Sequence, residues 1–197
     1  MSELTFLLHL GDPRVTMSLG AALFAWLLAA RAWRMALWWG LLLGAGLGLV
    51  AVSKIVFLGW GGGVPVFGYK ALSGHAAGAS AVFPMLFWMV AHGRADGWQG
   101  RALRAGLGVG ALIGALLVVD DQHSVAEALA GCGLGAAVSL GSIRLGSAGM
   151  PALPWPGLVL AMVALLMAAW LMKWAHLGYW MIRAARLLTG NSHVYPL

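Results

Sequence analysis

Charged side chains are scarce in this 197-residue sequence: Asp, Glu, Lys and Arg make up only 9% of it, and 61% of its residues are hydrophobic. Soluble domains carry roughly 25% charged residues, so the composition excludes a chain surrounded by water on all sides. Apolar runs near the ~20 residues needed to cross a bilayer recur along the chain. The sequence therefore predicts an all-α, polytopic membrane protein.

Cysteine is nearly absent as well. The single cysteine, Cys132, lies in an apolar run, which excludes an intramolecular disulfide and is typical of a small buried hydrophobic residue. The start Met1-Ser2-Glu3 lacks the basic residues of a cleavable signal peptide, so none is expected. No stretch has the composition of a soluble second domain or a long linker. Residues 1–197 are therefore expected to form one integral membrane domain.

Basic residues outnumber acidic ones by 12 to 6, which gives a net charge of +6. They are scattered over predicted helix ends instead of forming one stripe, so nucleic acid is not expected as a partner and anionic lipid head groups are. The 29 glycines and many alanines favour close approach between helices in lipid. Such faces pack within a monomer as well as between protomers, so the oligomeric state is left open.

The apolar runs predict six membrane-spanning helices, at about residues 14–31, 36–58, 73–92, 103–119, 124–142 and 157–172. Residues 2–12 are too short to span, and the chain from Lys173 onward is amphipathic. Both predict interfacial helices at the ends of the chain. Residues 59–65 contain four Gly and one Pro, which predicts a loop.

Arginines give the expected orientation, because cytoplasmic loops of membrane proteins carry an excess of Lys and Arg. The arginines outside the C-terminal tail gather mainly on one predicted face: Arg31, Arg34, Arg94, Arg101, Arg104 and Arg144. That face is expected to be cytoplasmic. The opposite face, with residues 59–75 and 120–123 and both termini, is then outside, which in a Gram-negative bacterium means the periplasmic side of the inner membrane.

Two short polar stretches interrupt the apolar pattern, residues 70–75 and residues 120–127. Each places a histidine, His75 or His123, at the start of a predicted helix. The predicted helices return both histidines to the face that Lys54 approaches from the end of its own helix. Ionisable groups at membrane depth cost roughly 2.5–3.5 kcal/mol each on insertion scales and usually serve a function. These residues are therefore candidate site residues.

Phosphoryl chemistry suits this combination of groups. A neutral imidazole can attack phosphorus, and a second, protonated imidazole can protonate the leaving group. A lysine and the free N–H groups at helix starts stabilise phosphate oxygens. Glu127 lies four residues after His123 on the same helical face, where its carboxylate can fix the imidazole tautomer.

These residues resemble the motifs of the type 2 phosphatidic acid phosphatase superfamily of membrane lipid phosphatases. That family has a Lys followed seven residues later by Arg-Pro, then Pro-Ser-Gly-His, then Ser-Arg, five residues, His, three residues and Asp. The sequence keeps Lys54 of the first motif, Ser73-Gly74-His75 of the second and His123 of the third, with Leu72 and Glu127 at the positions of Pro and Asp. The resemblance covers residues 14–142.

The resemblance implies roles for these residues. His123 would be the nucleophile that forms a phosphohistidine, His75 the general acid, and Glu127 the partner of His123. Lys54, Ser73 and Gly74 would bind phosphate, and Lys70 is a candidate to assist them. The implied substrate is a lipid phosphate or polyprenyl diphosphate, and no cofactor is expected.

The sequence also departs from the family pattern. Gly61 and Gly62 stand at the position of Arg-Pro, and Leu116 and Leu117 at the position of Ser-Arg, so both motif arginines are missing. A bidentate arginine is a strong phosphate ligand, and its loss leaves less charge at the site. Lys70 and the backbone N–H groups of residues 60–63 are candidate substitutes.

Three other interpretations stay open. The two histidines can be structural, hydrogen-bonded residues. A divalent metal ion held by a set of His and carboxylate ligands can replace the arginines, the candidates being His75, His123, Asp120, Asp121 and Glu127. The chain can also be a catalytically altered relative that binds or moves phospholipid head groups without hydrolysing them.

Overall fold

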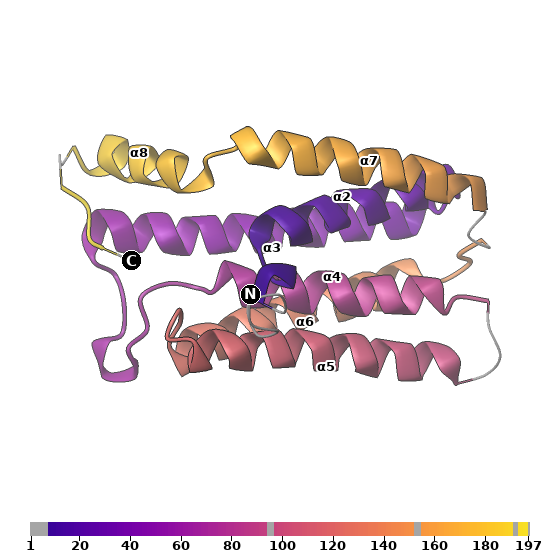
Figure 1. Cartoon of the computed structure of the whole chain (residues 1–197), viewed down its shortest axis with the longest axis horizontal. Coiled ribbons are helices and arrows are strands. Elements are labelled where there is room, and N and C mark those ends of the chain that lie inside the picture. Colours follow the sequence, from indigo (N-terminus) through magenta and orange to yellow (C-terminus); the bar gives the residue numbers. More distant parts are fainter. Residues whose placement is uncertain (1–7, 94–96, 152–154, 191–192, 197) are drawn as a thin grey trace.

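The computed structural model describes residues 8–93, 97–151, 155–190 and 193–196, and Figure 1 shows them as long helices running side by side. The predicted all-α class is confirmed for these residues, which form no strand beyond one isolated bridge, Val64 to Tyr69. The helices are α2 (Pro13–Ala29), α3 (Trp33–Trp60), the short 3-10 helix η1 (Pro65–Phe67), α4 (Gly74–Val90), α5 (Trp98–Val119), α6 (Val125–Gly146), α7 (Trp155–Trp174) and α8 (Leu177–Thr189).

Four of these helices are long and apolar enough to cross a membrane: α3, α5, α6 and the part of α7 from Gly157 onward. Their exposed surfaces carry many large apolar side chains, as expected of a membrane-embedded protein. The other two predicted spans correspond to α2 and α4, which have 17 residues each. That length is at the lower limit of roughly 17–25 residues for a spanning helix, so six crossings stay a prediction.

The predicted loop at residues 59–65 was wrong at its start, because α3 continues through Gly59 to Trp60. A Cβ atom at Gly59 would lie 2.9 Å from Thr189 Cγ2, so the glycine lets α8 pack closely against α3. This packing offsets the roughly 1 kcal/mol that glycine costs inside a helix. The helix ends at Gly61, which has a φ of 67°.

Other boundaries also differ from the prediction. Helix α5 begins at Trp98 and not near residue 103, and α6 continues to Gly146. The amphipathic tail after Lys173 forms α8, which packs against α3. Of the predicted interfacial helix at residues 2–12, residues 8–10 are helical and residues 2–7 lie outside the described part of the chain.

Helix α4 is the central element of the fold and packs chiefly against α5 and α6. Its residues from Ala76 to Met85 are all buried. The approach of α6 is close because Gly131 faces the first turn of α4: a Cβ atom there would lie 2.6 Å from the Ser73 carbonyl oxygen. This contact holds the starts of α4 and α6 together, and with them His75 and His123.

Candidate active site

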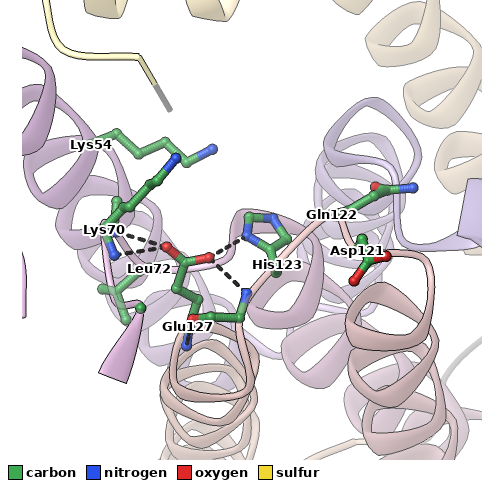
Figure 2. A pocket seen from close by; sticks show the side chains of 10 residues that line it. Lys54, Lys70, Leu72, Asp121, Gln122, His123 and Glu127 are labelled. Carbon is green, nitrogen blue, oxygen red and sulfur yellow. Dashed lines mark hydrogen bonds and ion pairs between the residues drawn. The ribbon is translucent and has the colours of Figure 1, made fainter. Parts of the chain in front are cut away.

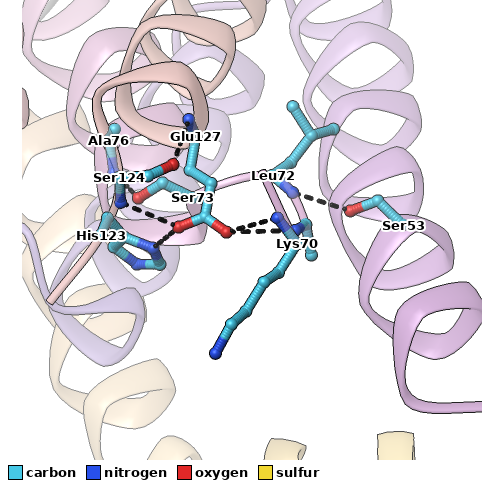
Figure 3. Close-up of polar contacts among 9 residues, drawn as sticks. Ser53, Lys70, Leu72, Ser73, Ala76, His123, Ser124 and Glu127 are labelled. Atoms are coloured by element: carbon cyan, nitrogen blue, oxygen red, sulfur yellow. Dashed lines mark hydrogen bonds and ion pairs between the residues drawn. The ribbon is translucent and has the colours of Figure 1, made fainter. Parts of the chain in front are cut away.

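Two serine caps start the helices that carry the candidate histidines. Ser73 Oγ accepts a hydrogen bond from the Ala76 N–H at 3.3 Å, and Ser124 Oγ accepts one from the Glu127 N–H at 3.3 Å. The Glu127 carboxylate returns to the Ser124 N–H at 3.1 Å, which completes a capping box (Figure 3). The start of α6 is therefore fixed by the same carboxylate that the sequence assigns to His123.

The predicted contact between His123 and Glu127 is present. His123 Nδ1 lies 3.0 Å from Glu127 Oε2, and the two side chains are 16% and 8% exposed. A carboxylate accepts hydrogen bonds, so Nδ1 carries the proton in this contact. In the neutral imidazole the lone pair is then on Nε2, which is the protonation state a nucleophilic histidine needs.

The second oxygen of Glu127 binds the loop that precedes α4. Oε1 accepts the N–H of Lys70 at 2.8 Å and the N–H of Ala71 at 3.2 Å (Figure 3). The carboxylate thus accepts four hydrogen bonds, which join the loop, the α6 N-terminus and His123. Partial burial and the negative charge of Glu127 raise the pKa of the neighbouring Tyr69 hydroxyl above its ordinary value.

A cavity of about 360 Å³ opens beside this carboxylate. It lies between the end of α3, the loop before α4 and the turn between α5 and α6 (Figure 2). Its lining is mostly polar and consists of Lys54, Gly68, Lys70, Ala71, Leu72, Asp121, Gln122, His123, Ser124 and Glu127. Four residues that the sequence placed in the candidate site therefore share one cavity: Lys54, Lys70, His123 and Glu127.

Both lysines bring positive charge into the cavity. Neither ammonium group forms a hydrogen bond or an ion pair with the described residues. Figure 2 shows both side chains extending to the same side of the Glu127 carboxylate. Because Glu127 is already bonded to four N–H groups, the charge of the lysines is available to an anion bound in the cavity.

His75 lies next to this cavity without lining it. Its ring centroid is 6.1 Å from that of His123, with an angle of 56° between the planes. Its Nδ1 is buried and has no hydrogen-bond partner among the described residues. A buried polar atom without a partner is costly, and such atoms are often found at functional sites. The two histidines are thus adjacent, as expected for two groups acting on one substrate.

The remaining predicted site residues lie elsewhere. Ser73 is fully buried as the cap of α4, and neither it nor Gly74 lines the cavity. Asp121 does line it, whereas Asp120 is exposed and accepts a hydrogen bond from Gln122 Nε2 at 2.6 Å. Within the described ranges, no three His, Cys, Asp or Glu residues are grouped closely enough to hold a metal ion.

Two serines near the site were not predicted from the sequence. Ser124 closes the capping box, and the pattern Ser-x-x-Glu at residues 124–127 is a sequence signal that could have identified it. Ser53 Oγ accepts the Leu72 N–H at 3.2 Å and so ties α3 to the loop. No local pattern indicates that contact, because it joins residues far apart in the sequence.

Two positions correspond, by the resemblance, to the family's arginines, and neither has free space for that side chain. Leu117 is fully buried beside Ala76 and Ile113, so its side chain points into the core. At Gly61 the backbone φ is positive, and a Cβ atom would lie 2.9 Å from Tyr195 Cζ.

The comparisons with known proteins leave the function open. The chain is 35% identical over 130 residues to a Klebsiella pneumoniae protein described as an uncharacterized 22.5 kDa protein in a cps region. The matched region covers 66% of this chain and 62% of the relative, so the chain spans less than two thirds of that protein's length. No family model and no solved structure matches.

Proposed function

We propose that the protein is a membrane lipid phosphatase that removes phosphate from a lipid phosphate or polyprenyl diphosphate, as a divergent member of the type 2 phosphatidic acid phosphatase superfamily. One observation carries the proposal. A histidine whose Nδ1 is bonded to a buried carboxylate lines a cavity with two lysines, and a second histidine lies 6.1 Å away.

The proposed reaction has two steps. His123 Nε2 attacks phosphorus, the bond from phosphorus to the leaving oxygen breaks, and His75 gives that oxygen a proton. Water then attacks the phosphohistidine, the bond from phosphorus to nitrogen breaks, and inorganic phosphate leaves while His75 takes the proton of the water. Lys54 and Lys70 hold the phosphate oxygens, and Glu127 stabilises the charged imidazole.

Support for a lipid substrate comes from the surroundings of the cavity. Ser124 lines it, and the exposed apolar side chains of Val125 and Leu129 follow on α6. Val52 and Val56, also exposed, flank Lys54 on α3. A phosphorylated head group can therefore enter the cavity while its hydrocarbon chains stay against apolar helix surfaces in the bilayer.

We further propose six crossings, with α2 and α4 as short spans, and a cavity that faces the periplasm of a bacterial inner membrane. The relative of this chain is bacterial. Arg31 and Arg34 lie at the opposite end of α3 from Lys54, and Arg144 lies at the opposite end of α6 from Glu127. A basic cytoplasmic end and a periplasmic cavity agree with the positive-inside rule.

The test is phosphate release by the purified protein from a panel of lipid phosphates and polyprenyl diphosphates. His123→Ala is expected to lower the rate by at least about 1,000-fold, since it removes the nucleophile. His92→Ala, which removes a histidine just beyond the other end of α4, is the matched control and is expected to keep wild-type activity. No release from any substrate by a folded wild-type protein would refute the proposal.

EDTA separates this mechanism from a metal-dependent one. Asp121 and His123, two of the candidate metal ligands, both line the cavity. Phosphate release that depends on His123 and is unchanged by EDTA supports the phosphohistidine. Release that is lost with EDTA and restored by a divalent ion would replace that mechanism with metal-assisted hydrolysis.

A further inference from the structure

The C-terminal segment, residues 193–196, returns to the end of α3 (Figure 1). The Tyr195 N–H donates a hydrogen bond to the Leu58 carbonyl at 3.0 Å. The Tyr195 ring lies over Gly61, in the space that any side chain at position 61 would need. The segment is therefore attached at the point where α3 gives way to the loop.

An aromatic pair connects this attachment to the Lys70 side chain. The ring centroids of Tyr195 and Phe57 are 6.3 Å apart at an interplanar angle of 57°, a favourable tilted arrangement. On α3, Phe57 lies three residues after Lys54. Its ring is also 6.0 Å from the Lys70 ammonium nitrogen, which is at the outer limit for an attraction between a cation and an aromatic face.

Lys70 is otherwise held only through its backbone. Glu127 fixes the Lys70 N–H, but within the described residues no anion pairs with the ammonium group. A lysine side chain has four rotatable carbon bonds, so a fixed backbone alone does not direct its charge. Among the described residues, the contact seen for the ammonium group is with the Phe57 ring, and Tyr195 packs against that ring.

We propose that the C-terminal segment contributes to the phosphate site: Tyr195 positions Phe57, and the Phe57 ring directs the Lys70 ammonium group into the cavity. Tyr195 is thus a positioning residue. The link to phosphate rests on the proposed function, whereas the link from Tyr195 to Lys70 does not. The two links are tested separately.

The first measurement needs no substrate. The rate at which an amine-acylating reagent modifies Lys70 is followed by mass spectrometry of the full-length protein. Tyr195→Ala is expected to raise that rate about threefold or more, because the ammonium group loses its contact. Tyr195→Phe keeps the ring and the wild-type rate. Tyr179→Ala removes a similarly exposed tyrosine from α8 and is the matched control.

The second measurement is the KM and kcat of phosphate release. Tyr195→Ala is expected to raise KM about three- to tenfold and leave kcat near the wild-type value, as for a lost contact that binds substrate and transition state equally. In a Lys70→Ala background the same substitution has no further effect, because the residue through which Tyr195 acts is gone.

The outcomes distinguish the two proposals. Wild-type Lys70 reactivity in a folded Tyr195→Ala protein would overturn the inference, and so would an additive effect in the Lys70→Ala background. Thermal unfolding identifies a variant that is merely unfolded, in which case Tyr195→Leu is used in its place. If the wild-type protein releases no phosphate, the proposed function fails while the reactivity of Lys70 still decides the link to Tyr195.

Discussion

Glu127 and Lys70, which are 57 residues apart in the sequence, are joined by a 2.8 Å hydrogen bond from the Lys70 N–H to the Glu127 carboxylate. The other oxygen of that carboxylate bonds His123 Nδ1. One side chain thus connects the candidate nucleophile to the loop that carries a candidate phosphate ligand. Its loss is expected to affect both the fold of the site and its chemistry.

Replacing Glu127 with glutamine tests this connection. The glutamine amide has one acceptor oxygen where the carboxylate has two. Its NH₂ group must therefore face N–H groups that donate hydrogen bonds to the carboxylate in the wild-type protein. We expect Glu127→Gln to destabilise the protein by roughly 2–4 kcal/mol through unpaired donors, and to lower kcat by roughly 10²–10⁴-fold. Thermal unfolding in detergent and phosphate release measure the two effects.

Asp120→Asn is the matched control for that substitution. Asp120 is exposed, and its carboxylate bonds only Gln122 among the described residues, so Asp120→Asn is expected to change the free energy of unfolding by less than about 0.5 kcal/mol. Equal effects of the two substitutions would contradict the connecting role of Glu127.

The close approach of α6 to α4 gives a second prediction. Gly131→Ala places a methyl group against the Ser73 carbonyl and is expected to cost roughly 1–3 kcal/mol. Gly133→Ala, two residues further along the same helix, has no atom within 4 Å of its added methyl group. It should be neutral or stabilise by up to about 1 kcal/mol. Equal unfolding temperatures for the two variants would refute this account of the helix contact.

Much of the site was predictable because its determinants are local. Ser73 and Ser124 are helix caps with recognisable side chains, and the spacing of four between His123 and Glu127 places both on one helical face. These contacts depend on residues within one turn of each other. Their geometry therefore follows from helix periodicity and capping, and the contact between His123 and Glu127 is present as the sequence predicts.

Contacts between distant segments were not predictable in this way. The continuation of α3 through Gly59 depends on α8, and the bond from Glu127 to the loop at Lys70 depends on the packing of α6 against α4. The contact between Tyr195 and Gly61 likewise joins two residues that are far apart in the sequence. No local pattern encodes these contacts, because each is decided by which helices pack together.

Lys54 gives a third prediction, since its ammonium group lines the cavity without a partner among the described residues. Lys54→Ala is expected to raise the KM of phosphate release by roughly 10- to 100-fold, the usual size of one hydrogen bond to a charged group. Lys173→Ala removes an exposed lysine near the end of α7 and should leave KM unchanged. A wild-type KM for Lys54→Ala would remove this residue from the site.

Placing an arginine at position 117, which the resemblance aligns with an arginine of the family, is expected to prevent folding. Leu117→Arg would bury a charge in the core between α4 and α5, at a cost of several kcal/mol, and we expect the variant not to accumulate in membranes. Val119→Arg, two residues later at an exposed position, should accumulate normally. Immunoblots of membrane fractions compare the two, and a well-expressed Leu117→Arg variant with higher activity would show that the core can accept the arginine.

The number of crossings can be tested with two single-cysteine variants in a Cys132→Ala background. Val66 lies between α3 and α4 and is 88% exposed, and Ala148 follows α6 and is also exposed. If α4, α5 and α6 all cross the membrane, these positions are on opposite faces. If only the four long helices cross, two crossings separate them and they lie on the same face.

A membrane-impermeant maleimide added to intact spheroplasts distinguishes these arrangements. We expect it to label Val66→Cys and to reach Ala148→Cys only after lysis, because the positive-inside rule predicts a cytoplasmic location for the arginine-rich helix ends. Labelling of both positions before lysis would mean that α4 does not cross the membrane. A crossing by α5 would then separate His75 from His123, in conflict with the 6.1 Å between their ring centroids. Labelling of Ala148→Cys alone would keep all three crossings but turn the cavity toward the cytoplasm, where a periplasmic substrate could not reach it.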